Sequence, residues 1–141
     1  MDFQTAVFYF LSAILVFASL RVITARNPVH AALHLILAFF TCGGIWALLQ
    51  AEFLAIAIIL VYVGAVMVLF LFVVMMLDIN IERMREGFWA NLIPGLIVAG
   101  LMLAEMIAVL GARYFSAAGA PAPEAPGAGY SNTKELGRLI Y

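Results

Sequence analysis

Charged residues are scarce in this sequence: only 15 of its 141 residues are Lys, Arg, Asp or Glu, and the formal net charge is -1. Soluble domains carry charge on roughly a quarter of their residues, so an ordinary soluble domain is excluded. Nucleic-acid binding is excluded too, because seven scattered cations cannot form the clustered footprint that a phosphate backbone requires. With 67% hydrophobic residues, the chain is suited to lipid rather than to water.

Cysteine is nearly absent, since Cys42 is the only one. This excludes an intrachain disulfide, a multi-cysteine metal site and an iron-sulfur cluster held by this chain alone. Gly-rich phosphate loops, nucleophile elbows and paired inward carboxylates are missing as well. We therefore expect no catalytic residue, bound cofactor or metal ion in this chain, and we interpret Cys42 as a small packing residue.

Long apolar runs are what the sequence has in abundance. The uncharged stretches between successive charges contain 18, 25, 25 and 18 residues. About 20 apolar residues in a helix span a hydrocarbon core of about 30 Å. The sequence thus predicts an all-α integral membrane protein with four transmembrane helices, with cores at 3–20, 28–49, 53–77 and 88–112. The first run has no basic start and no small-residue cleavage site, so it is not a secretory signal.

Composition divides the chain into a transmembrane helical bundle (1–113), an Ala/Pro/Gly-rich extramembrane linker (114–130) and the start of a C-terminal helix (131–141). The linker composition cannot pack a core. Asn132 and Thr133 are expected to cap the amphipathic C-terminal helix. Asn27 followed by Pro28 predicts a sharp start for the second helix. Only residues 50–52 separate the second and third helices, which indicates a tight antiparallel hairpin.

Cations near the helix ends predict the orientation of the chain. Arg21 and Arg26 lie in the first linker, Arg83 and Arg85 lie in the third, and the second has none. By the positive-inside rule the first and third linkers are cytoplasmic. The N-terminus, the second linker and segment 116–130 are then expected outside, in the periplasm of a bacterium.

Two stretches carry a pattern that hydropathy alone does not require, 25–40 (ARNPVHAALHLILAFF) and 51–78, which contains VYVGA at 61–65. They closely resemble subunit J of bacterial NADH-quinone oxidoreductase, respiratory complex I, the counterpart of the sixth mitochondrially encoded membrane subunit. Residues 132–141 resemble that family's approach to its last helix, so the resemblance covers essentially the whole chain. The family has five spanning helices, and the fifth is expected but absent from this sequence.

The resemblance implies a non-redox membrane subunit of a proton-translocating NADH:quinone oxidoreductase in the bacterial inner membrane. Flavin, iron-sulfur clusters and quinone would then belong to other subunits. The implied partners are lipid and the membrane subunits A, H, K, L, M and N of complex I, with A, H and K nearest. Two alternatives stay open at this point: a small subunit of a cation/proton antiporter complex, and a purely structural helix bundle.

Tyr62 and Gly64 interrupt a run that is otherwise mostly Ile, Leu, Val, Phe and Met. From the residues alone, Gly64 permits close helix approach and Tyr62 bonds a neighbouring helix. The resemblance favours gating instead, because the family's third helix carries a π-bulge near the matching Tyr and Gly, and its rotation is associated with opening and closing a water path. The predicted gating and coupling residues are Tyr62, Val63, Gly64, Ala65, Met67, Val68 and Phe70.

Two carboxylates are candidates for a proton path. Glu52 opens the third helix, where the macrodipole favours a negative charge, and an interfacial structural role is the alternative. Glu105 lies inside the fourth apolar run, where carboxylates are costly and usually pair or line hydrated cavities, so a paired structural role is favoured.

His30 and His34 have the i, i+4 spacing of some metal-ligand pairs, but no carboxylate or cysteine lies near them in the chain. Hydrogen bonding near the cytoplasmic interface is the favoured interpretation. A solvated loop that a partner subunit could contact is expected around Asp78, Glu82, Arg83, Arg85 and Glu86.

Overall fold

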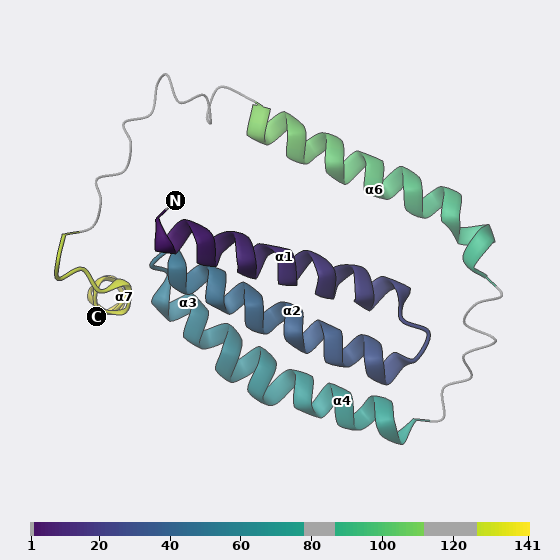
Figure 1. Cartoon of the computed structure of the whole chain (residues 1–141), viewed down its shortest axis with the longest axis horizontal. Helices are drawn as coiled ribbons and strands as arrows, with labels where there is room; N and C mark the ends of the chain where they lie inside the picture. The colour runs from purple at the N-terminus through teal and green to yellow at the C-terminus, as the bar shows by residue number, and fades with distance from the viewer. Residues whose placement is uncertain (1, 78–86, 112–126) are drawn as a thin grey trace. The chain divides into compact units, whose positions relative to one another are not determined.

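The computed structural model describes residues 2–77, 87–111 and 127–141, apart from the Phe88 side chain (Figure 1). Every regular element in these ranges is a helix. The elements are α1 (Phe3–Thr24), α2 (Pro28–Leu48), α3 (Glu52–Ala57), η1 (Ile58–Val66), α4 (Met67–Met76), α6 (Phe88–Gly111) and α7 (Asn132–Ile140). Because α3, η1 and α4 follow one another without a break, we call Glu52–Met76 helix three.

Four helices within the described ranges are long and apolar enough to cross a membrane, which confirms the expected all-α fold. These spans are in α1, α2, helix three and α6, and contain 22, 21, 25 and 23 residues. At a rise of about 1.5 Å per residue, each is about 30 Å or longer, which matches the hydrocarbon thickness.

The chain forms two compact units, one containing α1 to α4 together with α7 and the other containing α6. In the first unit α1 packs against α2, and α2 packs against all three parts of helix three. Successive helices run in opposite directions, so the start of α1, the end of α2 and the start of α3 lie at the same end of this unit (Figure 1). Helix α6 is the helix that the described residues form in the second unit.

Most of the buried residues in the first unit are small. Ala18 of α1 and Ala32 of α2 are almost completely buried, at 0% and 2% exposed, and Thr41 is buried on α2. The Thr41 hydroxyl is satisfied within its own helix, since it lies 2.9 Å from the carbonyl oxygens of Leu37 and Ala38. Small residues let membrane helices approach closely, and most large apolar side chains lie on the outside of this unit.

Helix α1 is longer than the charge pattern predicted. The expected core ended at residue 20, but the helix continues to Thr24 and includes Arg21 in its last turn. A cation is favourable there because the helix C-terminus carries a partial negative charge. The Thr24 hydroxyl also donates to the Leu20 carbonyl oxygen at 2.8 Å. Arg21 is therefore a helix residue and not part of the first linker.

The predicted start of the second helix and the tight hairpin after it are confirmed. The Asn27 side chain accepts a hydrogen bond from the Val29 backbone N–H at 2.9 Å, with Pro28 as the first helical residue. Three residues then connect α2 to α3. Gln50, in the middle of this connection, has a left-handed backbone with a φ of 60°.

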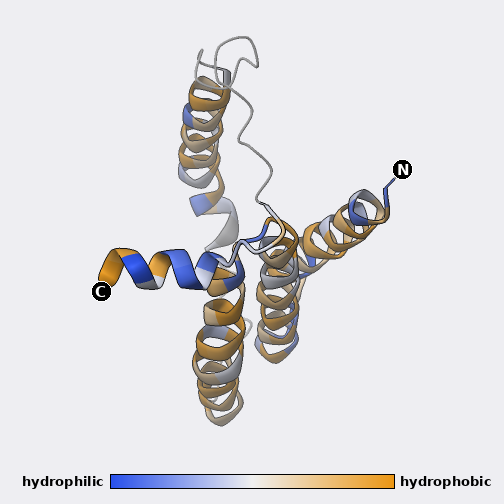
Figure 2. Cartoon of the chain, turned by 90° about the vertical axis from the view of Figure 1, so that its left-hand side faces the viewer, coloured by the Kyte–Doolittle hydropathy of each residue, from blue (hydrophilic) through white to orange (hydrophobic). Residues whose placement is uncertain are grey.

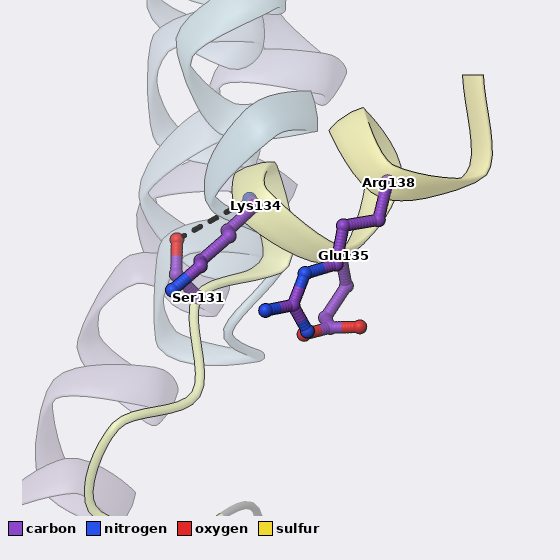
Figure 3. Close-up of polar contacts among 4 residues, drawn as sticks. All are labelled: Ser131, Lys134, Glu135 and Arg138. Atoms are coloured by element: carbon purple, nitrogen blue, oxygen red, sulfur yellow. Dashed lines mark hydrogen bonds and ion pairs between the residues drawn. The ribbon is translucent and has the colours of Figure 1, made fainter. Parts of the chain in front are cut away.

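Helix α7 is capped one residue earlier than predicted. Ser131, and not Asn132, is the N-cap: its Oγ accepts from the Lys134 backbone N–H at 3.4 Å, as Figure 3 shows. One turn further on, Arg138 and Glu135 form an exposed ion pair at 3.3 Å. Figure 2 shows polar and apolar residues alternating along α7, whereas the ribbons of the long helices are largely hydrophobic. The amphipathic character expected of this segment is thus present.

Candidate functional site

The middle of helix three is a π-helix of nine residues, Ile58–Val66. At its end the Met67 backbone N–H bonds to the carbonyl oxygen of Tyr62, five residues earlier, instead of the four of an α-helix. The expected bulge near Tyr62 and Gly64 is confirmed, and the π segment begins four residues before Tyr62. π-Type turns inside α-helices are rare and frequently mark functional sites.

Helix α2 accommodates the start of the π segment at Gly43. A Cβ atom at this glycine would lie 3.0 Å from Ile58 Cγ2 and 3.0 Å from Ile59 Cγ1, closer than side chains normally approach. Ile58 is 5% exposed and Ala55, three residues earlier, is 4% exposed. Gly43 therefore lets the π segment pack directly on the α2 backbone.

The adjacent Gly44 faces the other way, where a Cβ atom would lie 3.2 Å from Leu11 Cδ1 of α1. Sequence reasoning missed both glycines, although a Gly-Gly pair inside a long apolar run is a signal for close helix approach. Together they allow α2 to contact both of its neighbours at one level.

Tyr62 lies against α2 through its ring. The ring centroids of Tyr62 and Phe39 are 5.7 Å apart, and the ring planes are inclined at 38°. The side chain is 50% exposed, so one side faces outwards from the unit. Within the described ranges the phenol makes this aromatic contact and no hydrogen bond, so its hydroxyl is left for a group outside them.

Gly64 faces away from α2. A Cβ atom there would meet only the Ile59 carbonyl oxygen of the same helix, at 3.4 Å, which is an ordinary contact. Within the first unit, close helix approach thus depends on Gly43 and not on Gly64. Among the described residues of this unit, only the backbone of the π segment itself lies close to Gly64.

The other predicted gating residues are divided between the two sides of helix three. Met67 is buried and Val63 is partly buried, whereas Ala65, Val68 and Phe70 are exposed. A change in the register of the helix would therefore exchange inward and outward positions among these side chains.

The two candidate carboxylates lie in different units. Glu52 is an exposed residue in the first turn of α3, and Glu105 is exposed on α6. No hydrogen bond or ion pair to either carboxylate is found within the described ranges. A role for either group in proton transfer stays a prediction.

His34 bonds within its own helix. Its Nδ1 lies 2.7 Å from the His30 carbonyl oxygen, and its ring is in edge contact with Phe17 of α1, at 6.3 Å between centroids. This agrees with the favoured hydrogen-bonding interpretation of the pair. No group of three or more metal-ligating side chains occurs in the part of the chain that is described. The charged loop at 78–86 and linker residues 112–126 lie outside it.

Comparison with known sequences identifies a family that this chain resembles over most of its length. The family described as NADH-ubiquinone/plastoquinone oxidoreductase chain 6 matches residues 18–141. NADH-quinone oxidoreductase subunit J of Rhodobacter capsulatus is 43% identical, over 95% of this chain and 67% of its own length. Subunit J of Rickettsia bellii is 37% identical over 95% of this chain and 66% of its own length.

A chain 6 protein of NADH-ubiquinone oxidoreductase from Prototheca wickerhamii is 44% identical over 75% of this chain and half of its own length, 50%. The chain thus spans about two thirds of the length of the two bacterial relatives, 67% and 66%.

Proposed function

Because the chain belongs to the NADH-ubiquinone/plastoquinone oxidoreductase chain 6 family, which includes the bacterial J subunits, we propose that it is a non-redox coupling subunit of a proton-translocating NADH:quinone oxidoreductase. NADH oxidation and quinone reduction then take place on other subunits, which hold the flavin and the iron-sulfur clusters. This chain helps to link quinone reduction to proton translocation through the conformation of helix three.

The observation that carries this proposal is the π segment at Ile58–Val66. Conversion of a π-bulge to a regular α-helix changes the register by one residue, which rotates one flank by about 100° and shifts it by about 1.5 Å relative to the other. Such a rotation moves Met67, Val68 and Phe70 into or out of a water path between this subunit and its neighbours. A plug of this kind interrupts proton flow without binding a proton.

In a membrane, the π state of helix three needs an additional hydrogen-bonding partner for its backbone. A π-bulge leaves a backbone carbonyl without its usual partner, which is costly in lipid unless a side chain, a neighbouring helix or water supplies a bond. Tyr62 lies within the π segment and is half-exposed, and its hydroxyl is a polar group able to supply or recruit such a bond. We propose that membrane subunits A, H and K provide the surroundings in which this happens.

The proposed location is the bacterial inner membrane, with the N-terminus in the periplasm. The orientation rests on the arginines near the helix ends: Arg21, Arg26, Arg83 and Arg85 lie on the predicted cytoplasmic side, against Arg113 alone on the other side. The family and the four spans support a multi-pass membrane protein in either orientation.

Gly64→Val tests the coupling role. The β-branched side chain adds bulk where the backbone must rearrange, so NADH:quinone turnover should fall about tenfold, equivalent to about 1.4 kcal/mol on the barrier. NADH oxidation with artificial acceptors should be unchanged in the assembled complex. Gly100→Val in α6, where a Cβ atom would meet nothing within 4 Å, is the matched control.

Normal coupled turnover in the Gly64→Val enzyme would refute the gating role. Suppose instead that the wild type exchanges sodium for protons without NADH, and that the Gly64→Val variant loses this exchange while NADH oxidation is intact. The chain would then be a subunit of a cation/proton antiporter complex.

A further inference from the structure

The C-terminal helix reaches back to the first turn of helix three. The Asn132 side-chain oxygen accepts a hydrogen bond from the Phe53 backbone N–H at 3.4 Å, across 79 residues of sequence. Helix α7 packs against α3 at this point. In Figure 1 α7 is viewed along its axis at the end of helix three where α3 begins, so the two helices cross at a steep angle.

This contact supplies a cap that the local sequence lacks. The residue at the N-cap position of α3 is Ala51, whose side chain cannot accept a hydrogen bond, and none is made there. The first backbone N–H groups of a helix have no partner within the helix, so an external acceptor stabilises this end. Asn132 is free to act in this way because Ser131 caps α7 itself.

Two further restraints act on the same end of helix three. The connection from α2 is only three residues long and turns through the left-handed backbone of Gln50. A few residues later, Ala55 and Ile58 are buried. Ile58 packs against the α2 backbone at Gly43, where no side chain separates the two helices. Rotating α3 by about 100° would remove these side chains from α2 and break the bond to Asn132.

The other flank of the π segment has different chemistry. Helix α4 has the sequence MVLFLFVVMM, which is apolar on every side. Met67 and Val74 face inwards, but any other side chain of α4 can take their place without moving a polar group into lipid. Methionine, at three of its ten positions, adapts to different packing surfaces. Rotation therefore costs less in α4 than in α3.

We propose that α7 anchors the start of helix three through Asn132, so that a register change in η1 rotates α4 while α3 stays fixed against α2. The proposal extends the coupling function above and rests on it for the rotation, whereas the anchor is a property of the structure alone. Asn132 is a positioning residue: it acts on the direction of the movement through the Phe53 amide. The C-terminal segment thereby determines which side chains move.

Amide hydrogen exchange in the purified whole complex tests the anchor. Asn132→Ala should make the Phe53 amide exchange about fivefold faster, as expected for the loss of one hydrogen bond. Asn132→Asp should restore slow exchange, because a carboxylate oxygen accepts the same bond and suits a helix N-terminus. Thr133→Ala, at the exposed neighbouring position, is the control and should leave Phe53 unchanged. Equal exchange in the wild type and Asn132→Ala would overturn the proposal.

Structures of the assembled complex with substrate quinone and with a quinone-site inhibitor test the direction of movement. In the wild type, α4 should rotate between states while Ala55 and Ile58 keep their places on α2. In Asn132→Ala, α3 should rotate as well, and proton translocation per NADH oxidised should fall about twofold while the Asp variant restores it. A wild-type α3 that rotates against α2 would also overturn the proposal.

The two hypotheses fail in different ways. If helix three keeps the π segment in every state, the coupling function is refuted, but the exchange experiment still decides whether Asn132 anchors α3. If exchange at Phe53 does not depend on Asn132 while η1 does change register, the coupling function stands without the anchor.

Discussion

At the scale of single residues, the close contact between α2 and helix three depends on the absence of a side chain at Gly43. At this glycine two isoleucines of the π segment lie against the α2 backbone, and a Cβ atom there would lie 3.0 Å from each of them, closer than side chains normally approach. Gly64, which stands out in the sequence, faces outwards and has no comparable neighbour in this unit. The two glycines thus have separate roles, Gly43 in packing and Gly64 in the proposed rearrangement of the backbone.

Gly43→Val should weaken the subunit itself. Overpacking at a closely packed site costs about 1 to 3 kcal/mol, because the isoleucine side chains and the α2 backbone must move apart. We expect less assembled complex and an earlier loss of this subunit on heating, measured by native gel electrophoresis after a temperature series. Gly95→Val, at a site with nothing within 4 Å, should behave like the wild type. Equal thermal loss in both variants would show that the Gly43 contact is not important for assembly.

Glu105 should tolerate neutralisation. If it is a structural residue that bonds a neighbouring subunit, Glu105→Gln keeps a side chain able to donate and accept hydrogen bonds and removes only the charge. We expect most of the proton pumping to remain, measured in proteoliposomes with NADH and quinone. Loss of pumping in a fully assembled complex would instead place this carboxylate in the proton path.

At the scale of elements, helix three combines three segments with different constraints. α3 is held by a short connection and by α7, η1 has the wider π backbone, and α4 is uniformly apolar. Because a π segment stores one extra residue in the helix, releasing it changes the register of one flank relative to the other. Because α3 is held in place and α4 can adapt to a new packing surface, we expect such a change to rotate α4.

Helix three should therefore be found in two forms. High-resolution structures of the complex in several quinone-site states should show Ile58–Val66 as a π-helix in some and as a regular α-helix in others. The expected difference is a rotation of about 100° between α3 and α4. An identical backbone in every state would leave helix three as a structural element with an unusual turn.

At the scale of the whole molecule, the position of α7 bears on the path of the chain through the membrane. α1, α2 and helix three cross in alternate directions, so helix three ends opposite the side where α1 begins (Figure 1). α7 lies at the start of α3 and is thus back on the side of the N-terminus. We therefore predict one more crossing between these points, and α6 is the candidate span in the described part of that stretch.

Cysteine labelling tests this path and its orientation. On a Cys42→Ala background, a single cysteine at Ala120 should react with an impermeant reagent added from outside, and one at Asn80 should not. The expectation rests on the arginine distribution. Reversed labelling would invert the orientation, and labelling of both positions from one side would rule out α6 as a spanning helix.

Several features could be predicted from the sequence alone: the four spans in the described ranges, the start of α2 at Asn27 and Pro28, and the tight hairpin. The resemblance of the segment around Tyr62 and Gly64 to a known family also predicted a π-bulge there. These features depend on residues near one another in the chain: charge gaps, a cap beside its helix, a local pattern. Arg21 shows the limit, because a charge marked the end of an apolar run but the helix continued through it.

Which helix faces meet could not be predicted from the sequence, because it depends on how the helices pack in three dimensions. A helix that is apolar on all sides has no polar face to mark its outer surface, so hydropathy could not show that Gly43 rather than Gly64 faces a neighbouring helix. Nor could it show that Ser131 caps α7, leaving Asn132 to cap a helix 79 residues away. A capping side chain accepts from any N–H within reach, and the fold alone determines which N–H that is.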